Sequence, residues 1–214
     1  MSATLASMES GFADPVHDAQ QTFRVLLGAM AEPGRLFTLG PAATNGLQPS
    51  DPALRPPLSP ALAAALLTLA DADTPVHLSG SLATDEARAW LRFHIGARDP
   101  GKAAGLTATR ARDLDRALCR QLDLGTDDAP QSSATLLLEV DALSDAPLPG
   151  AVALNLRGPG IASARNVAVA GLTAEFWRWR TTLQAHLPRG IDLVLVCDTQ
   201  VVAIPRSTRI ESES

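Results

Sequence analysis

Two histidines, His17 and His94, are candidates for moving a proton, and His17 has an aspartate neighbour that can tune its imidazole. His17 follows Asp14 by three residues, in what we expect to be the first turn of a helix, where the carboxylate would favour its action as a base. The alternative is that His17 is simply exposed. His94 follows Arg92 by two residues in another expected helix. Both histidines are candidate catalytic residues.

Arginine dominates the basic residues and suits the binding of phosphate, phosphonate or carboxylate groups, because the guanidinium keeps its proton and donates paired hydrogen bonds. The chain has 17 arginines and one lysine. Each candidate arginine either faces an anion or forms an ordinary salt bridge with an acidic neighbour. The candidate substrate-binding or anion-binding residues are Asp14, Arg24, Glu32, Asp73, Arg92, Gly158, Gly160 and Arg206.

The glycine pair Gly158 and Gly160 follows an expected strand, and such glycines let backbone N–H groups approach a phosphate. However, Pro159 removes one donor, and Ser163 replaces the third glycine of a dinucleotide-binding pattern. A tight turn is therefore the favoured interpretation, with an anion-binding loop as the alternative.

The sequence gives little support to metal or cofactor chemistry. The four histidines show no zinc-binding spacing, and two cysteines cannot supply four thiolates to zinc or to an iron–sulfur cluster. Asp73 lies in an acidic loop suited to Mg²⁺, but such loops more often cap and close a turn. The single lysine, Lys102, lies in a Pro-Gly-Lys turn that should be exposed, which disfavours a Schiff base. We predict no metal and no cofactor.

Composition and charge exclude two classes of partner. The 214 residues include 18 basic and 23 acidic side chains, for a net charge of −5, which argues against a nucleic-acid-binding protein. No stretch approaches the roughly 18 apolar residues of a membrane span, and the N-terminus lacks a secretory signal. We expect a cytoplasmic protein with no nucleic-acid and no membrane partner, in which Cys119 and Cys197 are buried free thiols.

The elements that must position these residues alternate between helix and strand. Cap residues predict helices that begin at Asp14, Ser59, Thr84 and Thr173, and a charged helix is expected over 111–122. Short apolar runs predict strands at 35–39, 76–78, 106–109, 134–140, 152–156, 191–197 and 200–204. The last two strands should form a hairpin.

The continuous apolar run at 191–197 predicts a strand that is covered on both faces. This favours an α/β fold with three layers, α/β/α, around a mixed sheet. We expect a single domain over 13–210, with tails at 1–12 and 211–214 and a surface loop at 41–60.

Two helices have apolar stripes that we assign to the core. In the first, the stripe consists of Val16, Ala19, Phe23, Leu26, Leu27 and Met30. In the helix that begins at Thr173, it consists of Phe176, Trp179, Leu183 and Leu187. Trp177 lies off that stripe, and an exposed aromatic residue of this kind is a favoured interface anchor.

Several segments, taken in their order along the chain, resemble the PhnH family, the H subunits of the bacterial carbon–phosphorus lyase core complex. The similar segments are 14–20 (DPVHDAQ), 23–24 (FR), 29–34 (AMAEPG), 66–76 (LLTLADADTPV), 91–94 (LRFH), 134–136 (ATL), 156–161 (LRGPGI), 190–193 (GIDL) and 203–206 (AIPR). Together they span nearly the whole chain; the loop at 41–58 and both tails fall outside.

The resemblance implies a fold like the large domain of pyridoxal-phosphate transferases, without the cofactor. It implies a homodimer when isolated, and a complex with the G, I and J subunits. With the L subunit, that machinery converts MgATP and methylphosphonate to ribose 1-methylphosphonate 5-triphosphate and adenine. The family has no established catalytic residues, so the resemblance assigns none to this chain.

Two main functions are therefore weighed, beside a weaker third, a degenerate pyridoxal-phosphate enzyme. In the first, the chain is an assembly subunit of the complex, with no complete active site of its own. In the alternative, the candidate residues converge into an anion-binding or nucleotide-binding site that contributes to the synthase step. The second requires that these side chains meet in space.

Overall fold

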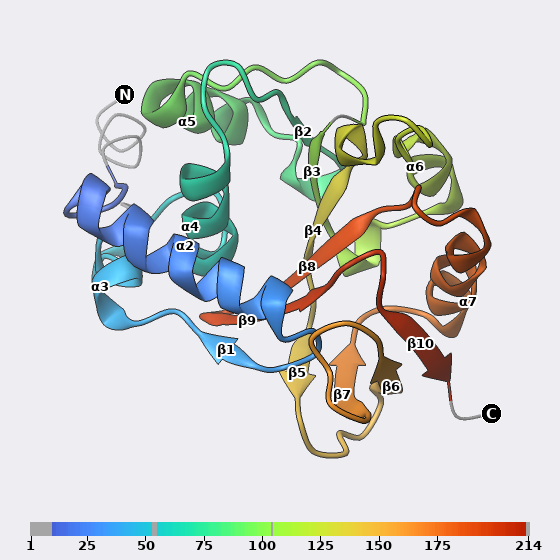
Figure 1. Cartoon of the computed structure of the whole chain (residues 1–214). Coiled ribbons are helices and arrows are strands. Elements are labelled where there is room, and N and C mark those ends of the chain that lie inside the picture. The colour runs from blue at the N-terminus through green and yellow to red at the C-terminus, as the bar shows by residue number, and fades with distance from the viewer. Residues whose placement is uncertain (1–9, 53–54, 104, 213–214) are drawn as a thin grey trace.

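A six-stranded mixed sheet lies at the centre of the structure, a computed structural model that describes residues 10–52, 55–103 and 105–212 (Figure 1). Strands β2, β3, β4 and β8 are parallel, whereas β9 and β1 are antiparallel to their neighbours. From edge to edge the order is β1 (Phe37–Thr38), β9 (Gln200–Ile204), β8 (Asp192–Cys197), β4 (Thr135–Glu139), β3 (Leu106–Arg110) and β2 (Val76–Leu78). The predicted α/β fold with a mixed sheet and the β8–β9 hairpin are confirmed.

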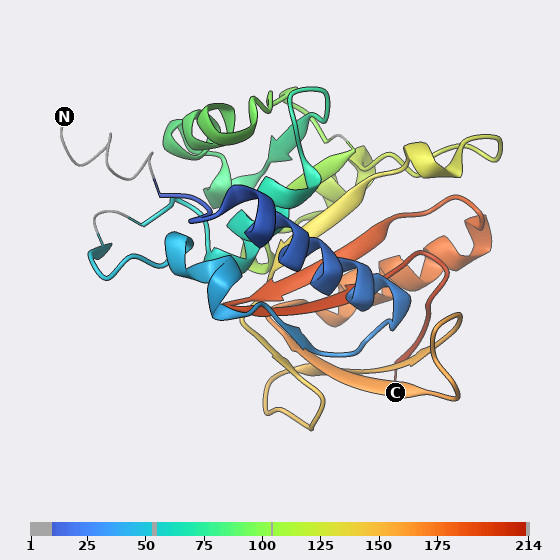
Figure 2. The same cartoon turned by 60° about the vertical axis from the view of Figure 1, so that its left-hand side comes forward.

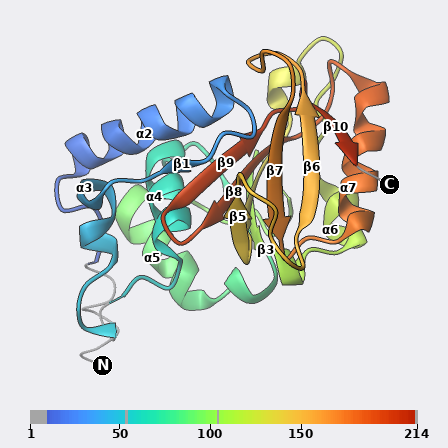
Figure 3. The same cartoon turned by 90° about the horizontal axis from the view of Figure 1, so that it is seen from below.

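A second, antiparallel sheet is the main element that the sequence prediction misses. Its order is β10 (Arg209–Ser212), β6 (Val152–Arg157), β7 (Arg165–Ala170) and β5 (Ala142–Ser144), and Figure 3 shows these strands side by side. Only β6 is predicted, because β5 and β7 contain several alanines and β10 is mostly polar, so their strand signals are weak. β10 also includes residues 211 and 212 of the predicted C-terminal tail.

Side-chain caps start three helices where the sequence predicts them. Asp14, Thr84 and Thr173 each accept a hydrogen bond from the backbone N–H three residues further on. The predicted helices are α2 (Pro15–Ala31), α4 (Pro60–Leu69), α5 (Asp85–Ile95) and α7 (Ala174–Thr182).

Two predictions of local structure are wrong. The single helix expected over 111–122 is a 3-10 turn (Ala111–Asp113) followed by α6 (Arg116–Gln121), because the Asp115 carboxylate accepts a hydrogen bond from the Leu118 N–H at 2.8 Å and caps a new helix. The loop expected over 41–60 contains α3 (Pro41–Thr44) and a 3-10 turn (Asn45–Leu47). The buried Leu47 side chain makes this turn part of the core.

The central strands alternate their side chains between two hydrophobic clusters, one on each face. Leu137 and Val194 belong to the cluster that also contains residues of α2, α4 and α5. Leu136 and Leu195 belong to the cluster that contains residues of α7 and of the second sheet. Figures 1 and 2 show α2 on the first side, where it packs on α4 and β9. The strand at 191–197 is therefore covered on both faces, as predicted, and the second sheet shares one covering layer with helices.

Trp177 is a core residue, which corrects its predicted role as an exposed anchor. Its exposed fraction is 1%, and its ring lies edge-on to that of Phe176, with centroids 5.0 Å apart. Trp179 is half-buried instead, and Leu187 is 44% exposed. The stripe was misplaced because a charged residue, Arg180, occupies a fully buried position on α7 and interrupts the apolar pattern.

The segment before α2 is held against α5. Trp90, fully buried, donates its indole N–H to the carbonyl oxygen of Ser10 at 2.9 Å, and Phe12 packs against the same core cluster. Residues 10–12 of the predicted tail therefore contact the core, whereas residues 1–9 lie outside the described residues.

Candidate functional site

The first turn of α2 uses Asp14 as a cap. The Asp14 carboxylate accepts the backbone N–H of His17 at 3.1 Å, and the exposed His17 imidazole lies 2.6 Å from the Gln21 amide nitrogen. Asp14 therefore contacts the His17 backbone, while Gln21 contacts its ring. In the described residues no hydrogen bond joins the Asp14 carboxylate to the His17 imidazole, so the direct contact expected between these two groups is absent.

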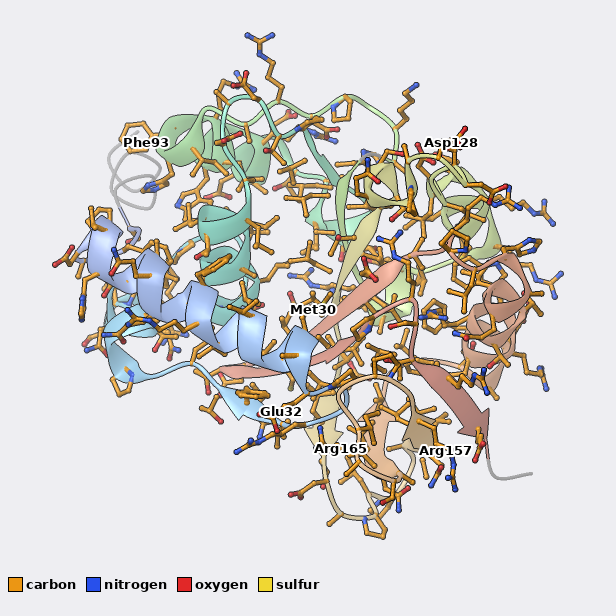
Figure 4. All side chains as sticks on the ribbon, viewed as in Figure 1. Met30, Glu32, Phe93, Asp128, Arg157 and Arg165 are labelled. Carbon is orange, nitrogen blue, oxygen red and sulfur yellow. The ribbon has the colours of Figure 1, made fainter. Side chains whose placement is uncertain are left out.

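Glu32 and Gly160 do come together, at the end of α2. Glu32 forms an ion pair with Arg35 at 2.8 Å, and Arg165 donates to the carbonyl oxygens of Glu32 and Pro33 at 3.0 Å each (Figure 4). A side chain at Gly160 would lie 2.1 Å from the carbonyl oxygen of Ala31. The close backbone contact at Gly160 fits the tight-turn interpretation, and Arg165 is a site residue that was not predicted.

Gly158 and Arg206 contact the chain around β10 and β8 instead. A side chain at Gly158 would meet the backbone of Ser207 and Thr208. The Arg206 guanidinium binds both carboxylate oxygens of Asp192 and donates to the carbonyl of Pro130. Arg206 therefore forms a salt bridge with an acidic neighbour, the alternative to anion binding. All three of its guanidinium nitrogens donate hydrogen bonds within the chain.

Asp73, Arg92 and His94 lie around α4 and α5. Asp73 is exposed in a turn organised by Asp71, whose pKa is lowered by the Thr74 hydroxyl and by backbone N–H donors. Arg92 is exposed, and the His94 ring lies 4.6 Å from that of Trp90.

The ten predicted residues therefore do not meet in one cavity. Phe93, next to His94, lies at the upper left of the view, away from Glu32 in its lower half (Figure 4). Arg24, exposed on the outer face of α2, lies apart from Arg206 beside Asp192. The nucleotide-site alternative requires these ten residues to lie around one site, and they do not.

A polar cavity that was not predicted lies where β3 and β4 end. It has a volume of about 280 Å³ and is lined by Arg110, Arg112, Glu139 and Asp141 among others. Together with Ser81 and Asp113, these residues form what we call the carboxyl-edge cluster. Ligands of open α/β sheets commonly bind outside the carboxyl ends of parallel strands, so charged residues directly after two expected strands were the available signal.

Internal contacts satisfy much of the carboxyl-edge cluster. Arg110 donates to Glu139 at 3.3 Å and to Ser81 at 2.9 Å. The Ser81 hydroxyl and backbone N–H donate to Asp113 and lower the pKa of that carboxyl, and the nearby arginines act in the same direction. Two guanidinium groups face three carboxylates, so the net charge is negative and does not favour an anion.

A face with unpartnered apolar side chains lies on α2 and corrects its predicted orientation. Val16, Phe23 and Leu27 are 71%, 50% and 56% exposed, although all three were assigned to the core. The buried face of α2 carries Asp18, Thr22, Leu26 and Ala29. It packs on α4, whose buried alanines allow close approach, so small and polar side chains face inward.

We call Val16, Phe23, Arg24 and Leu27 the α2 outer face. Spacings of seven and four residues place the three apolar members along one side of the helix. A shallow hollow of about 380 Å³ beside Phe23 and Arg24 extends to Thr68 of α4. Burial of each large apolar side chain contributes about 1.5–3 kcal/mol, so this face can stabilise a protein–protein contact.

Neither a metal site nor a membrane-spanning helix is found in the described part of the chain. The described residues contain no group of three or more His, Cys, Asp or Glu side chains placed to hold a metal ion. None of their helices is long and apolar enough to cross a bilayer. Lys102 is exposed in a turn, as predicted.

Comparison with known proteins decides the family. Residues 10–211 match the family described as "Bacterial phosphonate metabolism protein (PhnH)", from the segment before α2 into β10. The chain belongs to the PhnH family. The match covers both sheets, the α2 outer face and the carboxyl-edge cluster, and it confirms the resemblance drawn from the ordered segments.

Two curated relatives support the assignment to the PhnH family. The chain is 37% identical, over the full length of both proteins, to the Rhizobium meliloti (strain 1021) protein named alpha-D-ribose 1-methylphosphonate 5-triphosphate synthase subunit PhnH. It is 30% identical to the Stutzerimonas stutzeri putative C-P lyase subunit protein HtxG, over 89% of this chain and 85% of that protein.

Proposed function

We propose that this chain is the H subunit of a carbon–phosphorus lyase system in phosphonate catabolism. In this role it contributes, with the G, I and L subunits, to the formation of alpha-D-ribose 1-methylphosphonate 5-triphosphate from ATP and methylphosphonate. Full-length similarity to a protein named as a subunit of that synthase supports the proposal.

Its main contribution is assembly, and the α2 outer face is the surface that binds a partner subunit. The observation that carries this is the exposure of Val16, Phe23 and Leu27 along one side of one helix. These are three of the five large apolar side chains exposed in the described residues. Apolar patches of this kind mark protein interfaces.

The partners are the G, I and J subunits, and the isolated chain forms a homodimer. In a symmetric dimer the same surface of each subunit contacts its copy on the other. The α2 outer face permits such a contact because it is apolar apart from one charged residue, Arg24. The protein works in the cytoplasm. A likeness to the large domain of pyridoxal-phosphate transferases remains a prediction.

Co-purification tests the assembly role. Leu27→Asp places a charge in the middle of the α2 outer face, and Leu187→Asp is its matched control at an exposed leucine outside α2. After co-expression with the G, I and J subunits, we expect Leu27→Asp to reduce recovery of the complex at least about tenfold, equivalent to about 1.4 kcal/mol. The Leu187→Asp control should be recovered like the unmodified chain.

Two results would contradict this proposal. Recovery of Leu27→Asp at the level of the unmodified chain would show that the α2 outer face binds no subunit. Failure of the unmodified chain to co-purify with any core subunit would remove the assembly role altogether. Circular dichroism of both variants establishes that they are folded.

A further inference from the structure

A groove between α6 and α7 has a volume of about 750 Å³. One side of α7 lines it with Glu175, Arg178, Trp179 and Thr182, and α6 contributes Arg116, Cys119 and Arg120. Figure 1 shows the two helices next to each other, on the side of the central sheet away from α2. We call this cavity the α6–α7 groove.

The charges in the α6–α7 groove differ from those of the carboxyl-edge cluster. Arg116 forms an ion pair with Glu175 across the groove, and Asp115 is occupied as the cap of α6. Arg120 and Arg178 are exposed and have no ion-pair partner among the described residues. Three guanidinium groups and two carboxylates leave a net positive charge, with two arginines available to an anion.

Two aromatic side chains, Phe176 and Trp179, line part of the groove. Trp179 is half-buried, and its ring lies against that of the buried Phe176, with centroids 5.6 Å apart at an angle of 40°. Phe176 fixes the position of Trp179, while part of the indole still faces the groove. A planar base can stack on such a ring, and stacking of this kind contributes about 1–3 kcal/mol per base.

We propose that the α6–α7 groove binds a nucleoside polyphosphate. The base stacks against Trp179, and the phosphates contact Arg120 and Arg178. A volume of about 750 Å³ lies within the range of about 300–1,000 Å³ typical of small-molecule sites. This site is independent of the assembly role, because it is formed by one chain and lies on elements other than α2.

Tryptophan fluorescence of the full chain tests the site directly. Trp90 and Trp177 are fully buried, so a ligand in the groove should quench the emission of Trp179 in particular. ATP is added in EDTA, so that magnesium does not neutralise the phosphates, with excitation beyond the absorption of adenine. Adenosine, which lacks the phosphates, and inorganic tripolyphosphate, which lacks the nucleoside, are the matched probes.

We expect saturable quenching by ATP at millimolar concentrations or below, with weaker binding of both half-probes. Arg120→Gln and Arg178→Gln should each weaken ATP binding about tenfold, because each removes a charge-assisted contact. Arg157→Gln, at an exposed arginine on β6, is the control and should bind as the unmodified chain does. Trp179→Phe should bind ATP by calorimetry but lose the fluorescence change.

Three outcomes would overturn the proposal. Absence of saturable binding of ATP by both fluorescence and calorimetry removes the site. Unchanged affinity in Arg120→Gln and Arg178→Gln places any binding elsewhere. Equal affinity for tripolyphosphate and ATP removes the contact with the base and leaves only a general anion site.

Discussion

The Asp192 carboxylate, at the start of β8, accepts three hydrogen bonds from Arg206, which follows β9. The Arg206 backbone N–H and Nε donate to Oδ1 at 2.7 and 3.2 Å, and Nη2 donates to Oδ2 at 2.5 Å. The pair therefore ties together the open end of the β8–β9 hairpin, with side-chain exposures of 19% for Arg206 and 14% for Asp192.

Arg206→Lys is expected to destabilise the fold by about 1–3 kcal/mol, because lysine cannot reproduce the forked contact with Asp192. Urea unfolding monitored by circular dichroism measures the change. Arg209→Lys, at an exposed arginine in β10, is the control. An unchanged unfolding midpoint in Arg206→Lys would mean that the pair is not structural, and would favour Arg206 as an anion-binding residue.

The charge of Asp99 should make the stability of the fold depend on pH. Burial alone raises the pKa of this carboxyl, but hydrogen bonds from Arg88, Gly101 and His77 outweigh it and leave the pKa below its usual value. A lowered pKa in the folded state stabilises the fold above the unfolded-state value of about 3.9, and this stability is lost as the pH falls through the folded-state pKa.

Asp99→Asn should therefore be less stable than the unmodified chain at neutral pH, by about 1 kcal/mol. The difference should shrink as the pH falls from about 4, where the unfolded-state carboxyl is protonated, through the lower folded-state pKa, where the native carboxyl loses its charge as well. Thermal unfolding at a series of pH values measures this. A difference that stays constant across the series would contradict the role of the carboxylate charge.

The two tryptophans of α7 should differ in their effect on stability. Trp177→Ala is expected to cost about 3–5 kcal/mol, because it empties a fully buried position. Trp179→Ala should cost less, because the ring is only half-buried. Chemical denaturation of the two variants compares them. An equal cost would indicate that Trp179 is as much a core residue as Trp177.

Cys119 should react slowly with thiol reagents in the folded protein. Burial, with a contribution from Asp115, raises the pKa of its thiol to about 11. The thiolate fraction should therefore rise about tenfold per pH unit up to that value, because only the thiolate is the nucleophile. Alkylation rates in a Cys197→Ser background measure this, and a rate that levels off near pH 8.5, the ordinary thiol value, would contradict it.

Local signals predicted the elements better than they predicted helix orientation. The caps at Asp14, Thr84 and Thr173 are short-range patterns, and each starts a helix at the predicted residue. The faces of α2 and α7 depend on what lies opposite each helix. α2 packs on the alanine-rich α4, and Arg180 is buried on α7. Both facts depend on tertiary packing, which the apolar periodicity of a single helix does not reveal.

The candidate sites were the least predictable part. Residues such as Arg24 and Arg206 were chosen by type and family resemblance, but one is exposed on α2 and the other is bonded to Asp192. The α6–α7 groove joins segments about 60 residues apart, as the pairing of Arg116 with Glu175 shows. Only the packing of α6 beside α7 brings those segments together.

The hydrogen bond from the Trp90 indole to the Ser10 carbonyl limits where the chain can be shortened. A trimmed protein that starts at Ala13, just before the cap of α2, would leave a buried indole N–H without its acceptor and remove Phe12 from the core. Vectors for expression should therefore retain Ser10, even though the first helix begins only at Pro15.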